Sequence, residues 1–368
     1  MKKTVGIITL FGNTNYGNKL QNYALQKVLE DMNFNVQTIK TLKISKKKTF
    51  FEKILIYRSN LLEIIISKLN NRKNRMIENK RLEKFIQFSK QYLNETESII
   101  FENAIPENLK NEYDFFITGS DQVWHPTFGA SSLEFLSFVP EFKRISYAAS
   151  FGISNIPSHL KEYYKTELEK MKSISVREET GAKIVRELIG DDVDVHVDPT
   201  MLLNKNKWLK IINTSKVKSH NYILTYFLGE AYNEYNNWIK TFSRKHNLEI
   251  INILDIKNEQ IYTSDPSEFL GLISNATLMC TDSFHGSVFS IIFETNFMVF
   301  DRIKNNEAVM GSRIETLLEK FNFNSRKWKN NISDNDVLNM SFMHSKAILE
   351  YEQHKALTYL RKALKVED

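Results

Sequence analysis

Short apolar runs that end in polar or glycine-rich turns recur along most of the chain, and segments with helical spacing separate them. Residues 5–10 form the first such run, which ends in the turn-forming stretch 12–18. Apolar positions in 19–32 then recur at helical spacing, and 34–39 is a second strand-like run. This β–loop–α–β order is typical of a parallel sheet covered by helices.

The alternation continues through two further stretches of the chain. In the first half it predicts strands at 113–118, 143–149, 174–176 and 193–197, with helices at 158–171 and 181–189. In the second half it predicts strands at 222–227, 248–253, 276–279 and 297–300, with helices at 232–246, 287–294 and 313–321. Residues 335–366 are helical in pattern throughout.

A chain of 368 residues exceeds the usual size of one hydrophobic core, so we expect two α/β domains. The predicted boundaries are 1–205 for an N-terminal domain, 206–334 for a C-terminal domain and 335–368 for a long C-terminal helix. The fold class is therefore α/β, with two Rossmann-like domains that face a cleft. Residues 45–100 depart from the alternation and predict a helical insertion in the first domain.

The basic charge of the chain is concentrated in this insertion. Residues 40–90 hold 15 Lys and Arg against 4 Glu, a net charge of +11, whereas the whole chain carries +6 and the remainder therefore −5. One interpretation is a helix that packs on the domain with a solvated basic face. The other is a patch that contacts anionic lipid or a lipid-linked substrate. No recognition motif accompanies the charge, so we expect no nucleic acid partner.

Composition excludes several classes of protein. With one cysteine, Cys280, the chain cannot form an internal disulfide, and no Cys/His spacing resembles a zinc site. No window reaches the length of a membrane-spanning helix, and the first residues lack the pattern of a signal peptide. We therefore expect a cytoplasmic protein, with a peripheral position at the inner membrane face as the extension of the lipid interpretation.

The stretch Cys280-Thr281-Asp282-Ser283-Phe284-His285-Gly286 places a lone histidine between a predicted strand and a predicted helix. The carboxyl end of a strand in an open α/β sheet is where ligands bind, and a helix N-terminus favours an anion. An imidazole beside an anion can act as an acid or base near neutral pH. The alternative is a capped helix whose histidine packs locally.

Other polar residues follow predicted strands and would converge on the same cleft. Their types suit a small anion that carries phosphate and carboxylate, because arginine binds both groups through two hydrogen bonds. The candidates are Asn15, Gly17, Asn18, Asp121, Trp124 and Arg177 in the first half, and Ser283, His285, Arg302, Lys304 and Arg313 in the second. Structural alternatives remain open for several of them. Arg177 could pair with a glutamate of its own helix, Asp121 could cap a turn, Trp124 could pack in the core, and the loop from Gly12 to Asn18 could be a plain turn.

Four blocks of the sequence, in this order, resemble the polysaccharide pyruvyl transferase family. They are Gly119-Ser120-Asp121-Gln122-Val123-Trp124, Ser175-Val176-Arg177-Glu178, Asp198-Pro199-Thr200 and Thr281-Asp282-Ser283-Phe284-His285-Gly286, and they follow the loop from Gly12 to Asn18. The resemblance implies two Rossmann-like domains of the GT-B type. It also implies the transfer of pyruvate from phosphoenolpyruvate to two sugar hydroxyls as a cyclic ketal, with release of phosphate.

By this resemblance His285 is the acid and Arg177 binds phosphoenolpyruvate, the donor substrate. We expect the second domain, which holds His285, to be the donor side and the first domain to be the acceptor side. Asp121 would act as the base, and neither a metal nor another cofactor is implied. Many members carry arginine where this chain has Ser283, so Arg302, Lys304 or Arg313 would have to supply that charge. Two alternatives stay open: a GT-B glycosyltransferase that uses a nucleotide sugar, and a homologue that binds a glycan or partner without turnover.

Overall fold

The computed structural model describes residues 2–11, 14–42, 72–127, 129–217, 220–230, 233–304, 307–309 and 311–366. The lysines Lys46, Lys47 and Lys48 and the predicted helical stretch 50–69 lie outside the described residues. In the described part of the chain, no helix is long and apolar enough to cross a membrane.

The first half of the chain forms a parallel sheet with the strand order β2-β1-β5-β6. Its strands are β1 (Thr4–Ile8), β2 (Asn35–Thr38), β5 (Phe115–Thr118) and β6 (Arg144–Ser146). A short parallel pair, β7 (Ser175–Val176) and β8 (Asp194–Val195), adjoins β6 through single bridges. The helical segments of this half are α1 (Tyr16–Asp31), α5 (Leu109–Glu112), η1 (Glu141–Lys143), η2 (Ser158–Leu160), α6 (Lys161–Glu169), α7 (Glu179–Ile189), η3 (Pro199–Leu202) and α8 (Lys205–Leu209).

The second half forms another parallel sheet with the order β10-β9-β11-β12. Its strands are β9 (Tyr222–Tyr226), β10 (Glu249–Asn252), β11 (Leu278–Thr281) and β12 (Phe297–Val299), followed by the antiparallel pair β13 (Arg302–Lys304) and β14 (Glu307–Val309). The helical segments are α9 (Asn233–His246), α10 (Glu259–Tyr262), α11 (Pro266–Ser274), α12 (Phe284–Phe293), α13 (Ser312–Lys320) and η4 (Asn324–Arg326). Two parallel α/β units are the fold class expected from the sequence.

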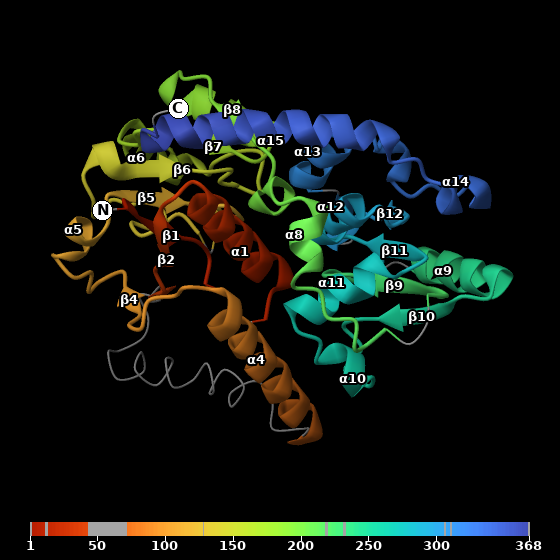
Figure 1. Ribbon diagram of the computed structural model, residues 1–368. Coiled ribbons are helices and arrows are strands. Elements are labelled where there is room, and N and C mark those ends of the chain that lie inside the picture. Colours follow the sequence, from red (N-terminus) through yellow and green to blue (C-terminus); the bar gives the residue numbers. More distant parts are fainter. Residues whose placement is uncertain are drawn as a thin grey trace.

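The described part of the insertion spans both halves of the molecule. Its ends are joined by β3 (Thr41–Leu42) and β4 (Ile100–Phe101), and its helix α4 (Arg72–Tyr92) contacts α10 and α11 of the second half (Figure 1). Lys80 pairs with Glu259 and Lys84 with Glu268, both across the two halves. Part of the basic charge of the insertion is therefore engaged within the molecule.

The C-terminal stretch is two helices, not the single helix predicted for 335–366. α14 (Asp334–Leu338) ends at Asn339, and α15 (Met343–Leu364) starts after a short connection. In that connection the backbone N–H of Met340 donates to Asn296, and the ring of Phe342 packs against Phe323. A continuous helix would be incompatible with these contacts. α15 then runs along both halves (Figure 1).

One hydrophobic core joins the two sheets. A single cluster of buried side chains includes Ile7 and Ile117 from the first sheet, Leu224 and Met279 from the second, and Leu360 from α15. The strand order reverses between β1 and β5 and again between β9 and β11. Ligands bind at the carboxyl ends of strands at such reversals. We therefore expect a ligand site at the loops that follow β5 and β11.

Candidate active site

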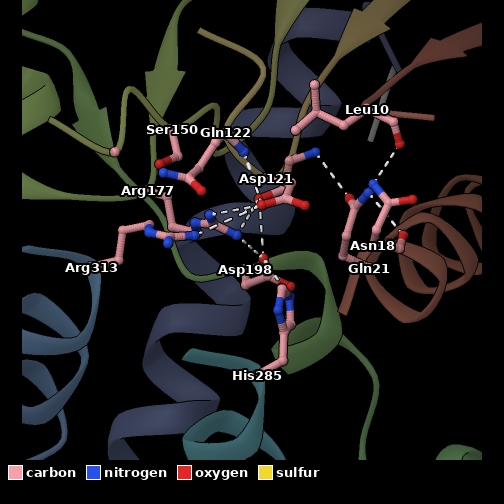
Figure 2. Close-up of polar contacts among 12 residues, drawn as sticks. Leu10, Asn18, Gln21, Asp121, Gln122, Ser150, Arg177, Asp198, His285 and Arg313 are labelled. Atoms are coloured by element: carbon pink, nitrogen blue, oxygen red, sulfur yellow. Dashed lines mark hydrogen bonds and ion pairs between the residues drawn. The ribbon is translucent and has the colours of Figure 1, made fainter. Parts of the chain in front are cut away.

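Polar side chains from both halves of the chain meet at the carboxyl ends of the strands (Figure 2). Asp121 follows β5, Arg177 follows β7 and Asp198 follows β8, whereas His285 and Arg313 lie in the first turns of α12 and α13. Each of these positions is a strand end or a helix start, which explains how residues so distant in the sequence share one site.

Asp198 lies at the centre of the group and is 1 % exposed. Its Oδ2 accepts hydrogen bonds from Arg177 Nη1 at 2.6 Å and Ser120 Oγ at 3.1 Å, and lies 3.5 Å from His285 Nε2. Burial opposes its charge, but His285, Arg177 and the backbone N–H of Thr200 together hold the pKa of Asp198 far below that of an ordinary aspartate. The carboxylate is therefore ionised throughout the neutral range.

His285 is held between the two halves. Ser283 is the N-cap of α12, and its Oγ accepts from the N–H of Gly286. His285 therefore lies in the first turn of a regular, capped helix. On one side the ring faces Asp198, and on the other it packs so closely on Gly17 of α1 that a Cβ there would overlap Nδ1. Its Nε2 is buried without a hydrogen-bond partner in the described residues.

Arg177 is buried, and its guanidinium is only partly satisfied. Nη1 donates to Asp198 and to Ser120, whereas Nε and Nη2 have no hydrogen-bond partner among the described residues. The guanidinium lies 4.6 Å from the centre of the Phe284 ring, a cation–π distance. Burial works against its charge, yet Asp198 and Asp121 raise the pKa of Arg177.

Asp121 lies between two arginines. Its backbone is left-handed (φ 65°), and its Oδ1 accepts from the N–H of Gln122. The same Oδ1 lies 3.5 Å from Arg177 Nη2 and 3.8 Å from Arg313 Nη1. Burial would raise the pKa of Asp121, but Arg177, His285 and Arg313 lower it below the ordinary value. It is an ionised but weak base.

Arg313 lies on the other side of the Phe284 ring, 5.9 Å from its centre. Burial and the neighbouring charge of Arg177 lower the pKa of Arg313 to about 10, so it keeps its charge at neutral pH.

Asn15 and Asn18, which were predicted to bind substrate, make hydrogen bonds within the protein at the start of α1. Asn15 caps α1 by accepting from the N–H of Asn18, and Asn18 Nδ2 donates to the carbonyl of Leu10 at 2.5 Å. One turn later, Gln21 Oε1 accepts from the N–H of Ser120. These contacts attach the loop after β5 to the start of α1.

Four other predicted residues lie outside this group or have no described role in it. Arg302 Nε donates to Asp282 at 3.1 Å, and Ser283 serves as a helix cap. Trp124 is fully buried in the core of the first half, where it stacks on Phe135. Lys304 belongs to β13, and its side chain is outside the described part of the structure.

Two important residues were missed as site residues. Asp198 is part of the Asp-Pro-Thr block, and its position directly after the predicted strand 193–197 could have identified it as a candidate. Glu178 follows Arg177 and is fully buried; its Oε1 accepts from Ser150 Oγ and from the N–H groups of Phe151 and Gly152. It positions the loop after β6, a role that no local pattern indicates.

The group therefore contains one imidazole, two arginines and two ionised carboxylates in a buried setting. Such a set can bind a small anion and transfer protons beside it. In the described residues, no group of His, Cys, Asp or Glu is arranged to hold a metal ion.

Comparison with known proteins gives a family and a fold. The family model described as polysaccharide pyruvyl transferase matches residues 15–304. No curated protein sequence matches the chain. A structure from Listeria monocytogenes, assigned as a UDP-N-acetylglucosamine 2-epimerase, is similar with a TM-score of 0.50 and 10 % identity over 100 % of this chain and 98 % of that one.

Two further solved structures are less similar. The complex of S. aureus MnaA with UDP has a TM-score of 0.48 and 11 % identity, over 100 % of this chain and 98 % of that one. A UDP-N-acetylglucosamine 2-epimerase from Rickettsia bellii has a TM-score of 0.46 and 9 % identity, over 99 % and 98 %. At these identities the likeness concerns the fold alone, and the Listeria structure supports a GT-B-like arrangement of the two α/β units.

Proposed function

The chain belongs to the polysaccharide pyruvyl transferase family, and we propose that it transfers pyruvate from phosphoenolpyruvate to two hydroxyls of a sugar. The product is a cyclic ketal on a precursor of a capsule or exopolysaccharide, and phosphate is released. The observation that carries the proposal is that His285 and Arg177, from different halves of the chain, share the carboxylate of Asp198.

The proposed reaction starts with a proton. His285 donates it to the methylene carbon of phosphoenolpyruvate, which leaves a positive charge on C2. A sugar hydroxyl adds to C2 through its oxygen, and its proton passes to a carboxylate, for which Asp121 is the candidate. The bond between C2 and the oxygen that bridges to phosphorus then breaks, its electron pair leaves with the phosphate, and the phosphate takes the proton held by Asp121. A second hydroxyl adds to C2 through its oxygen, and its proton passes to His285, which closes the ketal and restores the acid.

The electrostatics of the site support this assignment. Arg177 and Arg313 supply fixed positive charge for a trianionic donor and for the departing phosphate, and preorganised charge of this kind is a large part of catalysis. Asp198 stays ionised and holds both His285 and Arg177 in place. Asp121 is a weak base, which suits a hydroxyl whose proton becomes acidic only as the C–O bond forms.

A nucleotide-sugar glycosyltransferase has less support from the second half. At the reversal between β9 and β11, the N–H groups of Leu228 and Gly229 donate to the carboxylate of Asp282, at 2.7 and 2.8 Å. A nucleotide phosphate at this turn would have to displace a buried carboxylate that is also paired with Arg302.

Thermal unfolding with added ligand tests the proposal without knowledge of the acceptor. A ligand at about 100 times its Kd stabilises a protein by about 2.7 kcal/mol. We expect phosphoenolpyruvate to stabilise the wild-type protein and Arg177→Lys to lose most of this effect, because lysine cannot form the same two hydrogen bonds. Arg186→Lys, at an exposed ion pair with Asp192, is the matched control.

Stabilisation by UDP- or GDP-sugars instead of phosphoenolpyruvate would contradict the proposal in favour of glycosyl transfer. A protein without turnover is distinguished by His285→Ala. For a transferase, this variant still binds phosphoenolpyruvate but no longer releases phosphate in the presence of acceptor. For a binding protein, it retains its cellular function.

The basic segment 45–90 supports a further element of the proposal, a cytoplasmic enzyme that contacts lipid-linked precursors at the inner membrane face. Co-sedimentation with anionic vesicles at low and high salt tests this. We expect binding at low salt that is lost at high salt and weakened when Lys46, Lys47 and Lys48 are neutralised. Unchanged binding after that neutralisation would contradict it.

A further inference from the structure

A pocket of about 600 Å³ lies between α15 and the amino-terminal ends of β7 and β8 (Figure 1). A volume of this size is typical of a site for a small molecule. On α15 the lining positions recur at helical spacing, so they belong to one face of the helix. The residues that matter below are Lys172, Ser173 and Asp194 on the sheet side, and Tyr351, Thr358 and Lys362 on α15.

This pocket is separate from the candidate active site. Asp194 is the first residue of β8, whereas Asp198 follows the carboxyl end of that strand. In the same way, residues 172–174 precede β7, whereas Arg177 follows it. The pocket and the candidate active site therefore lie at opposite ends of the same two strands, and a ligand in the pocket would not touch the catalytic groups.

The pocket has a surplus of positive charge. Three lysines and one aspartate line it, a net charge of +2 with its histidine neutral. Lys355 pairs with Asp194 at the rim, at 3.1 Å, so the surplus belongs to Lys172 and Lys362. Lys172 Nζ donates to the carbonyl of Ala363 at 2.5 Å, which uses one of its three N–H groups. Lys362 is exposed and has no ion-pair partner among the described residues.

The other groups of the pocket suit a molecule with hydroxyl groups. The hydroxyl groups of Ser173 and Thr358 have no hydrogen-bond partner in the part of the chain that is described. Tyr351 is 66 % exposed, which leaves a large aromatic ring open to solvent at the pocket. The C–H face of a sugar ring packs well on such a ring, while its hydroxyl groups donate to and accept from small polar side chains.

A buried imidazole behind the pocket has unused hydrogen-bonding capacity. His196 is 1 % exposed, and its ring lies 4.9 Å from that of Tyr359, which lines the pocket. Neither nitrogen has a hydrogen-bond partner among the described residues, and Nε2 faces the rim, 4.0 Å from Asp194 Oδ2. Buried polar groups without a partner are rare in folded proteins, and they indicate a partner from outside the chain.

We propose that this pocket is a second ligand site, for a small anion that carries hydroxyl groups, of the sugar phosphate or sugar acid class. Lys172 and Lys362 bind the anionic group, Ser173 and Thr358 bind hydroxyl groups, and the sugar ring packs on Tyr351. The site is independent of the proposed function, because it shares no residue with the candidate active site.

Calorimetric titration of the full chain with four probes tests the site: glucose 1-phosphate, glucuronate, glucose and inorganic phosphate. We expect the wild type to bind at least one of the two sugar anions in the millimolar range or more tightly. Glucose and inorganic phosphate should bind at least about 10-fold more weakly, because each lacks one part of the recognised chemistry. Tighter binding of glucose 1-phosphate would identify a sugar phosphate, and tighter binding of glucuronate a sugar acid.

Two variants of the pocket have matched controls. Lys362→Gln should weaken the sugar anion about 5- to 10-fold through the lost charge, and Tyr351→Ala by about the same factor through the lost ring. Lys346→Gln, on the same helix at an exposed pair with Glu294, and Phe142→Ala, an exposed ring outside the pocket, should each change the affinity by less than about 2-fold.

Thermal unfolding without ligand establishes that each variant is folded, as we expect at exposed positions. If one is not, Thr358→Val, which removes a hydroxyl at similar size, takes its place. The proposal is overturned if the wild type binds neither sugar anion, if glucose or inorganic phosphate binds as tightly, or if the pocket variants bind as the wild type does. Binding that is lost in Arg177→Lys and retained in Lys362→Gln would place the ligand in the candidate active site and would also overturn it.

Discussion

Gly17, in the first turn of α1, packs directly against the imidazole of His285 from the other half of the chain. Any Cβ at position 17 would overlap Nδ1, Cγ and Cε1 of the ring. The glycine is therefore required by a close approach, and it fixes how near the first half comes to the proposed acid.

Replacement of Gly17 by alanine should displace His285. The ring lies between Gly17 and Asp198, so a Cβ at position 17 would change its position relative to Asp198, and a shift of about 1 Å at a catalytic group can cost about 100-fold in rate. We expect Gly17→Ala to lower turnover by about that factor, measured as phosphate released from phosphoenolpyruvate with an acceptor.

A double variant separates this contact from general damage to α1. If the overlap with the ring is the cause, Gly17→Ala should destabilise the wild-type protein but have almost no effect on stability in a His285→Ala background. Equal destabilisation in the two backgrounds would show that position 17 does not act through His285.

Asp198 should contribute to both stability and activity. In Asp198→Asn the charge of Arg177 remains buried without its closest partner, and breaking one side of a buried pair typically costs about 3 kcal/mol or more. Turnover should fall about 100-fold or more, because both His285 and Arg177 lose the group that orients them. Urea unfolding and phosphate release measure the two effects.

Asp194, four residues earlier, is the matched control for Asp198. It pairs with Lys355 at 3.1 Å on an exposed surface, and exposed pairs contribute less than about 1 kcal/mol. Asp194→Asn should therefore leave stability and turnover nearly unchanged. If Asp198→Asn behaves like this control, Asp198 does not organise the site.

The alternation of short apolar runs with helical segments was enough to predict two parallel sheets. The predicted strand at 222–227 and helix at 181–189 lie within two residues of β9 and α7. The break between α14 and α15 was missed, because it depends on Phe342 reaching the distant Phe323, which no local pattern encodes. The strand at 143–149 was predicted too long for a similar reason, since only Arg144–Ser146 pairs with β5.

That His285, Asp121 and Arg177 lie together was predictable, because each is a polar residue that follows a predicted strand. Which of these side chains contact each other is harder to predict, because the contacts depend on how the two halves of the chain meet. The sequence did not distinguish Arg302 from Arg313 as a cation for the site. The structure does, since Asp282 pairs with Arg302 while Arg313 lies beside Asp121.

His196 predicts a loss of stability in mild acid. It is 1 % exposed, its ring stacks on Tyr147 and contacts Tyr359, and its two nitrogens have no hydrogen-bond partner among the described residues. Burial lowers the pKa of His196 to about 4, with Asp194 opposing and Lys355 and Lys320 adding to the effect.

The sign follows from proton binding. In the unfolded chain a histidine has a pKa of about 6.5, so between pH 6.5 and 4 the unfolded state binds the proton and the folded state does not. The free energy of unfolding therefore decreases as the pH falls through this window, by about 2 kcal/mol at pH 5 from this residue. His196→Phe should remove that part of the pH dependence, whereas the exposed His354→Phe should not. Equal slopes for His196→Phe and the wild type would contradict the assignment.

Arg81 of α4 should be the main polar contact that attaches the insertion to the second half. Its guanidinium lies 5.0 Å from the ring centre of Tyr16 and 4.7 Å from that of Tyr262, and Nη1 donates to the carbonyl of Tyr262 at 3.1 Å. A desolvated cation–π contact and a charged hydrogen bond together predict that Arg81→Ala lowers the free energy of unfolding in urea by about 3 kcal/mol.

Lys80→Ala, one residue away at an exposed pair with Glu259, is the control and should lower it by less than about 1 kcal/mol. Arg81→Lys should lie between the two, because it keeps the charge and loses the planar group. If Arg81→Ala and Lys80→Ala are equally stable, α4 is held by its apolar side chains and the arginine contributes nothing to the junction of the halves.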